Sequence, residues 1–238
     1  MTTRRTALLI ADIGGYTAYM GTHRMSLAHA EVNTARLLDR IVAAAPGFDL
    51  VEIEGDAAFL SRRVAPESDA TLSDVLRTAA AMHRAFHAER EYVVANLCPC
   101  GGCREAKGLT LKFVAHVGDV ALQSIRGRTK PVGIDVILLH RLLKNDVSIR
   151  EYVLLTDDLY AGGADLPATA TGITADLEGI GPVPAHFVDV TELDAGPGPS
   201  RPGLGARLAS TFSAVGRGLP YMVGSKKPRR DRSPAAMG

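Results

Sequence analysis

The chain has 238 residues, of which 46% are hydrophobic and 22% charged, a composition typical of a globular domain with a full core. No apolar run reaches the length that spans a bilayer, and the apolar stretch behind the basic N-terminus is too short for a signal peptide. The sequence therefore predicts a cytoplasmic protein. Residues 195–238 carry eight Lys or Arg and one Asp, or +7, which leaves −6 for residues 1–194 and a total of +1. We predict one domain over residues 1–194 and a separate basic tail over residues 195–238.

Apolar runs, alternation and glycine turns predict the elements of this domain in chain order. The predicted strands are Thr6–Ala11, Asp49–Glu54, Ala57–Ser61, Leu109–Val117, Val120–Ile125, Tyr152–Thr156, Ile173–Leu177 and Ala185–Val190. The predicted helical segments are the region from the Gly14-Gly15 turn to about Ala45, Ala70 to about Asn96, Ile134–Lys144 and a turn capped by Asp157-Asp158. A turn at Gly118-Asp119 is expected to pair the two strands around it. Because most turns are hairpin-like, the sequence favours an α+β fold with a mostly antiparallel sheet.

Two acidic segments each place a carboxylate at a glycine turn after a predicted strand. The first, Ile10–Thr17, contains Asp12 before Gly14-Gly15, and the second, Glu52–Asp56, ends in Gly55-Asp56. Mg²⁺ is usually held by one or two carboxylates together with substrate phosphates, and backbone N–H groups at a glycine turn also bind phosphate. Taken singly, Asp12 is better explained as a helix cap and Asp56 as a turn residue. Together they favour a site for metal and nucleoside triphosphate.

Four segments, in the right order, resemble the signatures of class III nucleotidyl cyclases. Asp12–Thr17 resembles the D-I-x-G-F-T signature, and Glu52–Asp56 resembles the second metal motif, which ends in Gly-Asp. His116–Val120 resembles the H-x-G-x-V hairpin, and Gly133–Leu142 resembles the G-x-x-V-N-x-A-x-R-L helix. The resemblance covers about residues 6–192. It is closer still to an uncharacterised bacterial branch of cyclase-like proteins, with E-I-E-G-D-A, C-P-C-x-x-C and H-R-L-L-K-N as hallmarks.

The resemblance implies a ferredoxin-like class III cyclase fold, with helices flanking the central sheet, and a homodimer whose sites are shared between the two copies. Asp12 and Asp56, with the Ile13 carbonyl, would hold Mg²⁺ or Mn²⁺, and Arg141 would reach in from the partner to stabilise the transferring phosphate. The nucleotide would lie against Gly14, Gly15, Tyr16 and Thr17. A 3′-hydroxyl would then attack the α-phosphate and pyrophosphate would leave, giving a cyclic nucleotide for signalling. We predict no nucleic-acid partner.

The residues expected to bind the ribose and the phosphates depart from the pattern of the cyclase family. The ribose-orienting Asn of the family aligns with Ile137, and Glu178 and Ile180 stand where the family has phosphate-binding lysines. By analogy with oxyanion-hole donors, each loss would slow catalysis about 10²–10³-fold. Nucleotide binding is therefore a safer prediction than turnover, and a catalytically degenerate nucleotide or ligand sensor is the alternative.

The positions that select the base align with Glu52 and Lys130. Glu52 would accept from the N–H edge of guanine and Lys130 would donate to its carbonyl, which predicts a preference for guanine nucleotides. Alternatively, the two side chains pair with each other and fill the pocket, which avoids an unpaired charge. The sequence leaves both interpretations open.

The only three cysteines, Cys98, Cys100 and Cys103, lie within six residues. In a reducing compartment such a cluster suggests a metal before a disulfide, and tetrahedral Zn²⁺ would need a fourth ligand. His116 on the next predicted strand is one candidate, and His83 and His87, four residues apart on the preceding predicted helix, are others. A structural zinc clip and unligated thiols are both compatible with the sequence.

From Ala195 onwards Gly, Pro, Ser and Arg dominate the composition, and Lys226–Arg232 is a basic cluster. A disordered, solvated tail is one interpretation. The other is an arm that docks on a membrane surface or on a partner, since Gly203–Gly224 is weakly amphipathic. This gives a third hypothesis for the whole chain, a zinc-stabilised scaffold with a docking tail.

Overall fold

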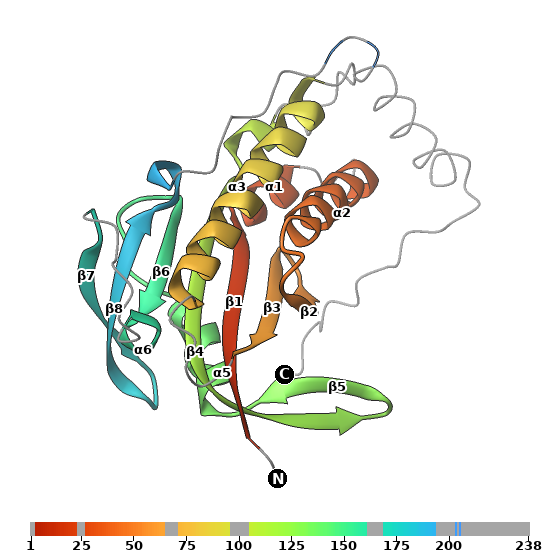
Figure 1. Ribbon diagram of the computed structural model, residues 1–238. Coiled ribbons are helices and arrows are strands. Elements are labelled where there is room, and N and C mark those ends of the chain that lie inside the picture. Colours follow the sequence, from red (N-terminus) through yellow and green to blue (C-terminus); the bar gives the residue numbers. More distant parts are fainter. Residues whose placement is uncertain are drawn as a thin grey trace, which may run out of the picture.

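The computed structural model describes residues 3–22, 27–64, 71–95, 105–160 and 169–193, together with residues 203 and 205. Within these ranges, eight strands form one sheet that carries helices on both faces (Figure 1). The strand order is β2-β3-β1-β4-β6-β8-β7, and β5 pairs with β4 outside this path. All pairings are antiparallel except that of β4 with β6. The predicted α+β fold with a mostly antiparallel sheet is thus confirmed.

The described elements have the following bounds. The strands are β1 (Arg4–Gly14), β2 (Asp49–Glu54), β3 (Ala57–Arg63), β4 (Thr110–Ile125), β5 (Arg128–Val132), β6 (Tyr152–Thr156), β7 (Thr171–Leu177) and β8 (Gly181–Asp189). The helices are α1 (Tyr16–Thr22), α2 (Leu27–Ala43), α3 (Thr71–Ala95), α5 (Ile134–Leu142) and α6 (Asp157–Tyr160), with short 3-10 turns η1 (Ala106–Gly108) and η2 (Val190–Glu192).

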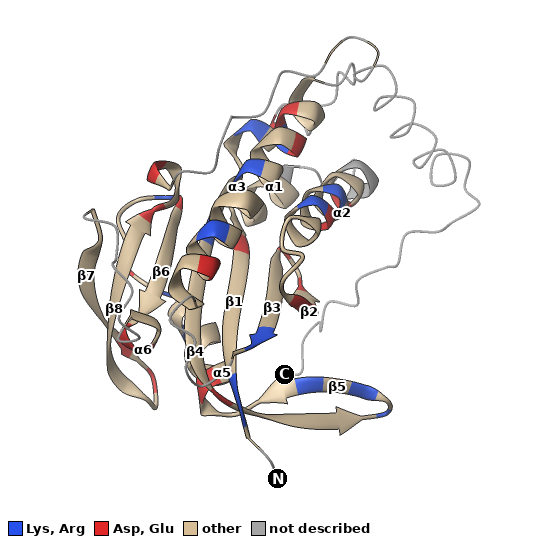
Figure 2. Ribbon diagram, viewed as in Figure 1, with Lys and Arg blue, Asp and Glu red and all other residues tan. Residues whose placement is uncertain are grey.

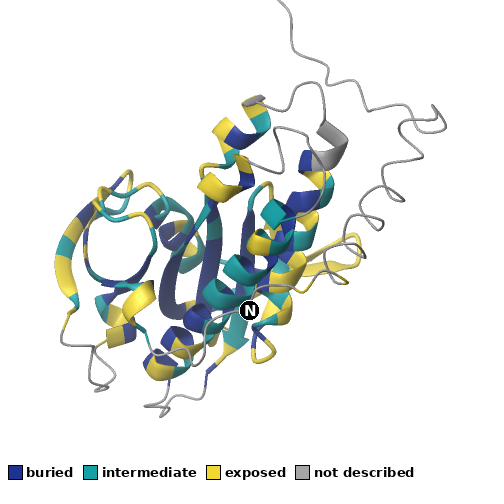
Figure 3. Ribbon diagram, turned by 90° about the horizontal axis from the view of Figure 1, so that it is seen from above, coloured by how far each residue is buried: buried dark blue, intermediate teal, exposed yellow. Residues whose placement is uncertain are grey.

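Each face of the sheet packs against its own helices, and the central strands are buried between them (Figure 3). Leu9, Ala11 and Ile13 of β1 belong to the core beneath α2 and α3, whereas Leu8 and Ile10 belong to the core beneath α5. Because side chains alternate along a strand, Asp12 follows Leu8 and Ile10 on the α5 face. Strand alternation therefore directs the Asp12 carboxylate away from the core beneath α2 and α3, which is the larger of the two.

The strand predicted over Leu109–Val117 does not turn at Gly118-Asp119, which corrects the sequence interpretation. β4 runs on through both residues to Ile125, and the hairpin to β5 turns at Arg126-Gly127 instead. Arg126 and Gly127 have φ of 51° and 78°, as a two-residue hairpin turn with both central residues in the left-handed region requires. Gly118 has a different role: a Cβ there would overlap the Asp135 carboxylate, which accepts a hydrogen bond from Asp119 N at 2.7 Å.

Other predicted segments differ from the structure in extent. The strand expected over Thr6–Ala11 is β1, which runs from Arg4 to Gly14 and so includes Asp12. The helical region expected from Gly14-Gly15 to about Ala45 contains two described helices, α1 and α2, and residues 23–26 lie outside the described part. β8 begins earlier than expected, at Gly181, and so includes Pro182 and Pro184. These prolines are tolerated because that part of β8 pairs only with β7, while β6 pairs with β8 from Ala185 onwards.

Cys98, Cys100 and Cys103 lie outside the described residues, and so does the predicted tail apart from residues 203 and 205. In the part of the chain that the structure describes, no helix is long and apolar enough to cross a membrane.

We predict that Gly118→Ala lowers the free energy of unfolding by about 1–3 kcal/mol, because Asp135 must move and lose its bond to Asp119 N. In a domain of this size each kcal/mol lowers Tm by roughly 2–4 °C. Thermal unfolding of Gly118→Ala, Asp135→Gly and the double variant measures the effect. The double variant should cost less than the sum of the two, because Asp135→Gly also removes the Cβ that would lie 2.7 Å from the new methyl group. Gly108→Ala is the matched control, since open space surrounds that position. Additive losses would contradict the clash.

Candidate functional site

Strand register brings the two predicted metal-binding carboxylates to one place. Asp12 near the end of β1 pairs with Ala57 of β3, the residue after Asp56, and Ile13 N donates to the Asp56 carbonyl at 3.2 Å. Burial raises the pKa of Asp56 above its ordinary value, and the negative charge of Asp12 raises it further. The two carboxylates thus lie in each other's electrostatic field. A divalent cation would relieve this repulsion, and two carboxylates are the hard oxygen ligands that Mg²⁺ or Mn²⁺ prefers.

A lysine that the sequence analysis did not single out completes this cluster. Lys112 on β4 lies directly across from Asp12 in the strand register, and its Nζ is 3.3 Å from Asp12 Oδ2. The same Nζ donates to the Leu143 carbonyl at 3.2 Å. The alternation over Leu109–Val117 already placed this residue on the opposite face from Leu111 and Phe113. Its partner could not be identified from the sequence, because β1 and β4, which bring Asp12 and Lys112 together, are about 100 residues apart in the chain.

The segment after Asp12 forms the turn into the first helix. β1 ends at Gly14, Gly15 has a φ of 81°, and α1 begins at Tyr16. Burial raises the pKa of Tyr16, the charge of Asp56 adds to this effect, and a hydrogen bond with Thr34 opposes it. The Tyr16 ring packs against the core beneath α2 and α3. Thr17 is exposed on α1. Gly14, Gly15, Tyr16 and Thr17 therefore follow Asp12 directly in the chain, and of these four Tyr16 feels the charge of Asp56.

Glu52 and Lys130 meet, as one of the two interpretations of the sequence has it. Lys130 Nζ on β5 donates to Glu52 Oε2 on β2 at 3.1 Å, and the two side chains are 53% and 42% exposed. The β4–β5 hairpin extends beyond the edge of the sheet and carries basic bands on β5 (Figure 2). This geometry brings β5 to β2, although neither strand pairs with the other in the sheet.

The Glu52–Lys130 pair stands between two hollows. One, of about 510 Å³, is lined by side chains of β2, β3, β5 and α5, among them Phe59, Ile137 and His140. His140 Nδ1 lies 3.4 Å from Glu54 Oε2, and its ring packs edge-on against Phe59. Ile137, which aligns with the ribose-orienting Asn of cyclases, is 47% exposed here. The position expected to bind ribose is therefore accessible but offers no side-chain hydrogen bond.

Arg141 is not brought together with Asp12 and Asp56. Its guanidinium lies against the β7–β8 turn, where a Cβ on Gly179 would be 3.1 Å from Nη1. That turn belongs to the β7 edge of the sheet, whereas Asp56 follows β2 near the other edge. Within one chain the arginine and the carboxylates therefore sit at separate places.

His116, a candidate fourth zinc ligand, has other partners among the described residues. It is buried, its Nδ1 is 2.8 Å from Thr156 Oγ1, and its Nε2 is 3.4 Å from Asp135 Oδ1, which is long for a hydrogen bond. Burial lowers the pKa of His116 and the nearby Arg5 lowers it further, whereas Asp135 and Asp158 oppose them. His116 is thus held neutral between β4, β6 and α5.

The comparisons with known proteins come from sequence and from structure. The family described as "Protein of unknown function (DUF2652)" matches residues 34–152, half of the 238-residue chain. The chain belongs to the DUF2652 family. This DUF2652 protein is also 35% identical over 196 residues to the uncharacterized protein Rv2561/Rv2562 of Mycobacterium tuberculosis (strain ATCC 25618 / H37Rv), a match that covers 81% of the chain and 90% of the relative.

Solved structures show the fold of the DUF2652 protein. The guanylyl cyclase Cya2 superposes with a TM-score of 0.56 at 18% identity, over 79% of this chain and 92% of that one. A bacterial light-regulated adenylyl cyclase superposes with a TM-score of 0.56 at 12% identity, over 91% of this chain. The chain spans only 57% of the length of that cyclase. These likenesses confirm the class III cyclase fold that the sequence motifs indicated.

We predict that the DUF2652 protein loses stability as pH falls below about 6.5, the ordinary pKa of histidine, partly because of His116. The unfolded chain takes up a proton on this side chain at a higher pH than the folded chain does, so acid favours unfolding. His116→Gln should lose less stability than the parent between pH 7 and pH 5, in chemical unfolding at each pH. His186→Gln, which removes a half-buried histidine paired with Asp157, is the control. Equal losses in His116→Gln and the parent would show that His116 does not contribute.

Proposed function

We propose that this protein binds a nucleoside triphosphate together with a divalent metal ion at Asp12 and Asp56. One observation carries the proposal: on a class III cyclase fold, the register of β1 and β3 brings Asp12 opposite Ala57, the residue after Asp56, and burial followed by the charge of Asp12 raises the pKa of Asp56. Lys112 compensates only part of this negative charge, because its one cation faces two carboxylates and the pKa of Asp56 is still raised. The presence of the pair at a glycine turn is therefore better explained by a ligand than by stability. Mg²⁺ or Mn²⁺ fits the donors, with the Ile13 carbonyl as a further ligand.

The residues around the carboxylates prepare the place for phosphate and metal. Lys112 balances the charge of Asp12 before a ligand arrives, and the turn at Gly14-Gly15 before α1 can offer backbone N–H groups to phosphate oxygens. Such ions, when bound, activate a hydroxyl and steady a leaving pyrophosphate. Lys112 also limits affinity, because the ion must share Asp12 with an existing salt bridge.

A second copy of the chain would bring Arg141 to the carboxylates, which lie apart from it within one chain. Arg141 lies at the β7 edge, away from Asp56, so a site containing both needs two molecules. Large apolar side chains are exposed on β2, β4 and α5 around the Glu52–Lys130 pair; they are Leu50, Ile53, Leu122, Ile125, Ile134 and Ile137. Burial of such side chains favours association. We propose a homodimer that closes over these elements and brings Arg141 to the carboxylates of the other copy.

Nucleotide binding is the principal proposal and cyclisation is the second. Ile137 cannot orient a ribose through its side chain, and the exposed Glu178 would repel phosphate where the family has a lysine. Asp12, Asp56 and Arg141 nevertheless keep the metal ligands and the phosphate-stabilising cation of the motif set. A nucleotide-dependent sensor needs only the metal ligands and Arg141. A cyclase would have to work without the amide that orients the ribose and without the lysines that bind phosphate.

The Glu52–Lys130 salt bridge is compatible with recognition of guanine. Both side chains are about half exposed, and such surface pairs contribute only about 0–1 kcal/mol, so a base can displace one partner from the other at little cost. Guanine offers an N–H edge to Glu52 and a carbonyl to Lys130, whereas adenine presents the reverse polarity at its amino group. We therefore propose a preference for guanine nucleotides.

Titration calorimetry of the full chain with GTP, with and without Mn²⁺, tests the proposal. We predict Mn²⁺-dependent binding that weakens at least about tenfold in Asp12→Asn and in Asp56→Asn, because each variant removes a charged ligand. Asp176→Asn, which removes an exposed carboxylate from β7, should bind as the parent does. Binding that is absent, independent of Mn²⁺, or unchanged in both variants would contradict the proposed site.

Parallel titrations with ATP measure the base preference, and Lys130→Ala should narrow any advantage of GTP. Equal affinities for GTP and ATP in the parent would refute guanine recognition while leaving the metal site intact. Product analysis for cyclic nucleotide and pyrophosphate separates the two candidate functions. Cyclic product in the parent that is lost in Arg141→Ala shows a cyclase, and binding without product shows a sensor.

A further inference from the structure

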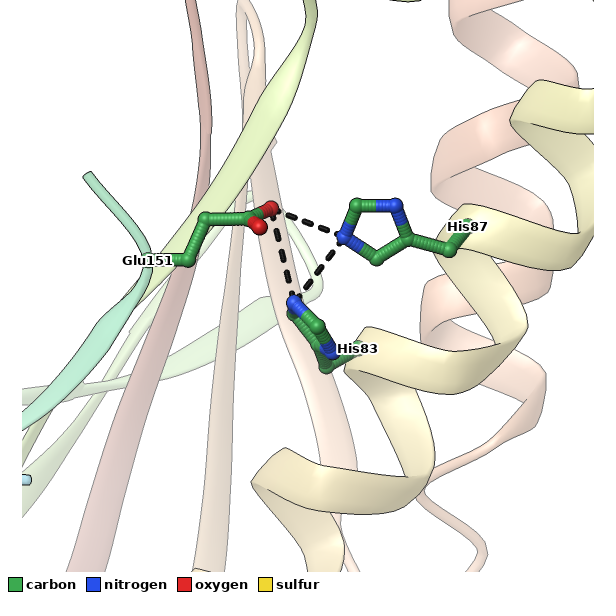
Figure 4. A group of neighbouring side chains, drawn as sticks. All are labelled: His83, His87 and Glu151. Carbon is green, nitrogen blue, oxygen red and sulfur yellow. Dashed lines mark hydrogen bonds and ion pairs between the residues drawn. The ribbon is translucent and has the colours of Figure 1, made fainter. Parts of the chain in front are cut away.

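A second group of metal-ligand side chains lies on the opposite face of the sheet from Asp12. His83 and His87 are one turn apart on α3, and both rings point at Glu151, the residue before β6 (Figure 4). His87 Nε2 is 2.9 Å from His83 Nε2 and 2.8 Å from Glu151 Oε1, and His83 Nε2 is 3.4 Å from the same oxygen. All three ligand atoms lie within 4.8 Å of one another.

Hydrogen bonds alone do not account for this arrangement. Each imidazole nitrogen has one in-plane site, which holds either a proton or a lone pair. If both Nε2 atoms carry protons that they donate to Glu151, two N–H groups repel each other, because the nitrogens are only 2.9 Å apart. If only one does, the other ring turns a lone pair toward the carboxylate. Three lone pairs around one cation satisfy all three atoms at once.

We propose that His83, His87 and Glu151 bind a borderline divalent cation of the zinc class. Zn²⁺ takes imidazole nitrogen and carboxylate oxygen at about 2.0–2.2 Å, and in a tetrahedron such ligands are roughly 3.3–3.5 Å apart. The observed separations of 2.8, 2.9 and 3.4 Å need only small side-chain shifts to reach these values. A water or another ligand would fill the fourth position.

The surroundings of Glu151 keep it ready to bind. The Leu111 N–H donates at 3.0 Å and so fixes the carboxylate from behind, as partners of metal ligands commonly do. The three side chains are 13%, 18% and 19% exposed, so solvent and an ion reach them.

The ion would join α3 to the sheet. His83 and His87 come from the helix that covers the core, Glu151 precedes the buried strand β6, and Leu111 lies in β4. Such a clip differs from the cysteine site that the sequence suggests, because two of its ligands lie on α3, the third directly precedes β6, and none is a cysteine. It is also independent of the nucleotide site, which uses the α5 face.

Zinc titration of the full-length chain, in a background where Cys98, Cys100 and Cys103 are all replaced by Ser, tests the proposal. After chelation and desalting, competition with a chromophoric indicator should show one equivalent of Zn²⁺ bound. His87→Ala and Glu151→Gln should each weaken binding at least about tenfold, and His186→Ala should not. Saturating Zn²⁺ should raise the Tm of the cysteine-free parent and leave that of His87→Ala unchanged.

A footprint on the unsubstituted histidines covers the case in which a variant fails to fold. Zn²⁺ should protect His83 and His87 from acylation by diethyl pyrocarbonate, read by peptide mass, and leave His186 reactive. No zinc binding in the cysteine-free chain, or equal modification of His83 and His87 with and without Zn²⁺, would overturn the proposal. Both results are independent of whether nucleotide binds at Asp12 and Asp56.

Discussion

The register of β1 between β3 and β4 is the constraint on which the rest of the structure depends. Along β1, one set of alternate side chains fills the core under α2 and α3, and the other faces α5. A slip of one residue would turn Asp12 into the larger core and Ile13 onto the α5 face. Such a slip is unfavourable because it would bury the charged carboxylate of Asp12 without a partner. The core therefore fixes the register, and the register in turn delivers Asp12 to Asp56 and Lys112.

β4 links the two candidate sites in one strand. Leu111 donates its N–H to Glu151 on the α3 face, and the next residue, Lys112, reaches Asp12 on the α5 face. The two faces carry different chemistry, imidazole and carboxylate on one and carboxylates with a lysine on the other. Because neighbouring residues of one rigid strand serve both, the position of β4 against α3 also sets the position of Lys112.

The sequence predicted those features that short-range patterns determine. The glycine turns, the strand alternation and the motif order located Asp12 and Asp56, and the hairpin of β2 and β3 was predicted with nearly the observed bounds. The Gly118-Asp119 turn was wrong because glycine there avoids the Asp135 side chain, which is a contact with α5 and not a local turn preference. Lys112 and Glu151 were missed because their partners are brought to them by strand pairing and helix packing across long stretches of chain. His83 and His87 were visible as a pair, but the carboxylate between them was not.

The central claim is that Asp12 and Asp56 together hold a divalent cation beside a nucleotide. Anomalous diffraction from crystals grown with Mn²⁺ and GTP tests it most directly, because manganese marks its own position. The account predicts a manganese peak within coordination distance of both carboxylates, with density for phosphate next to it. Nucleotide density with no manganese at Asp12 and Asp56, or manganese bound only at another place in the molecule, would contradict it.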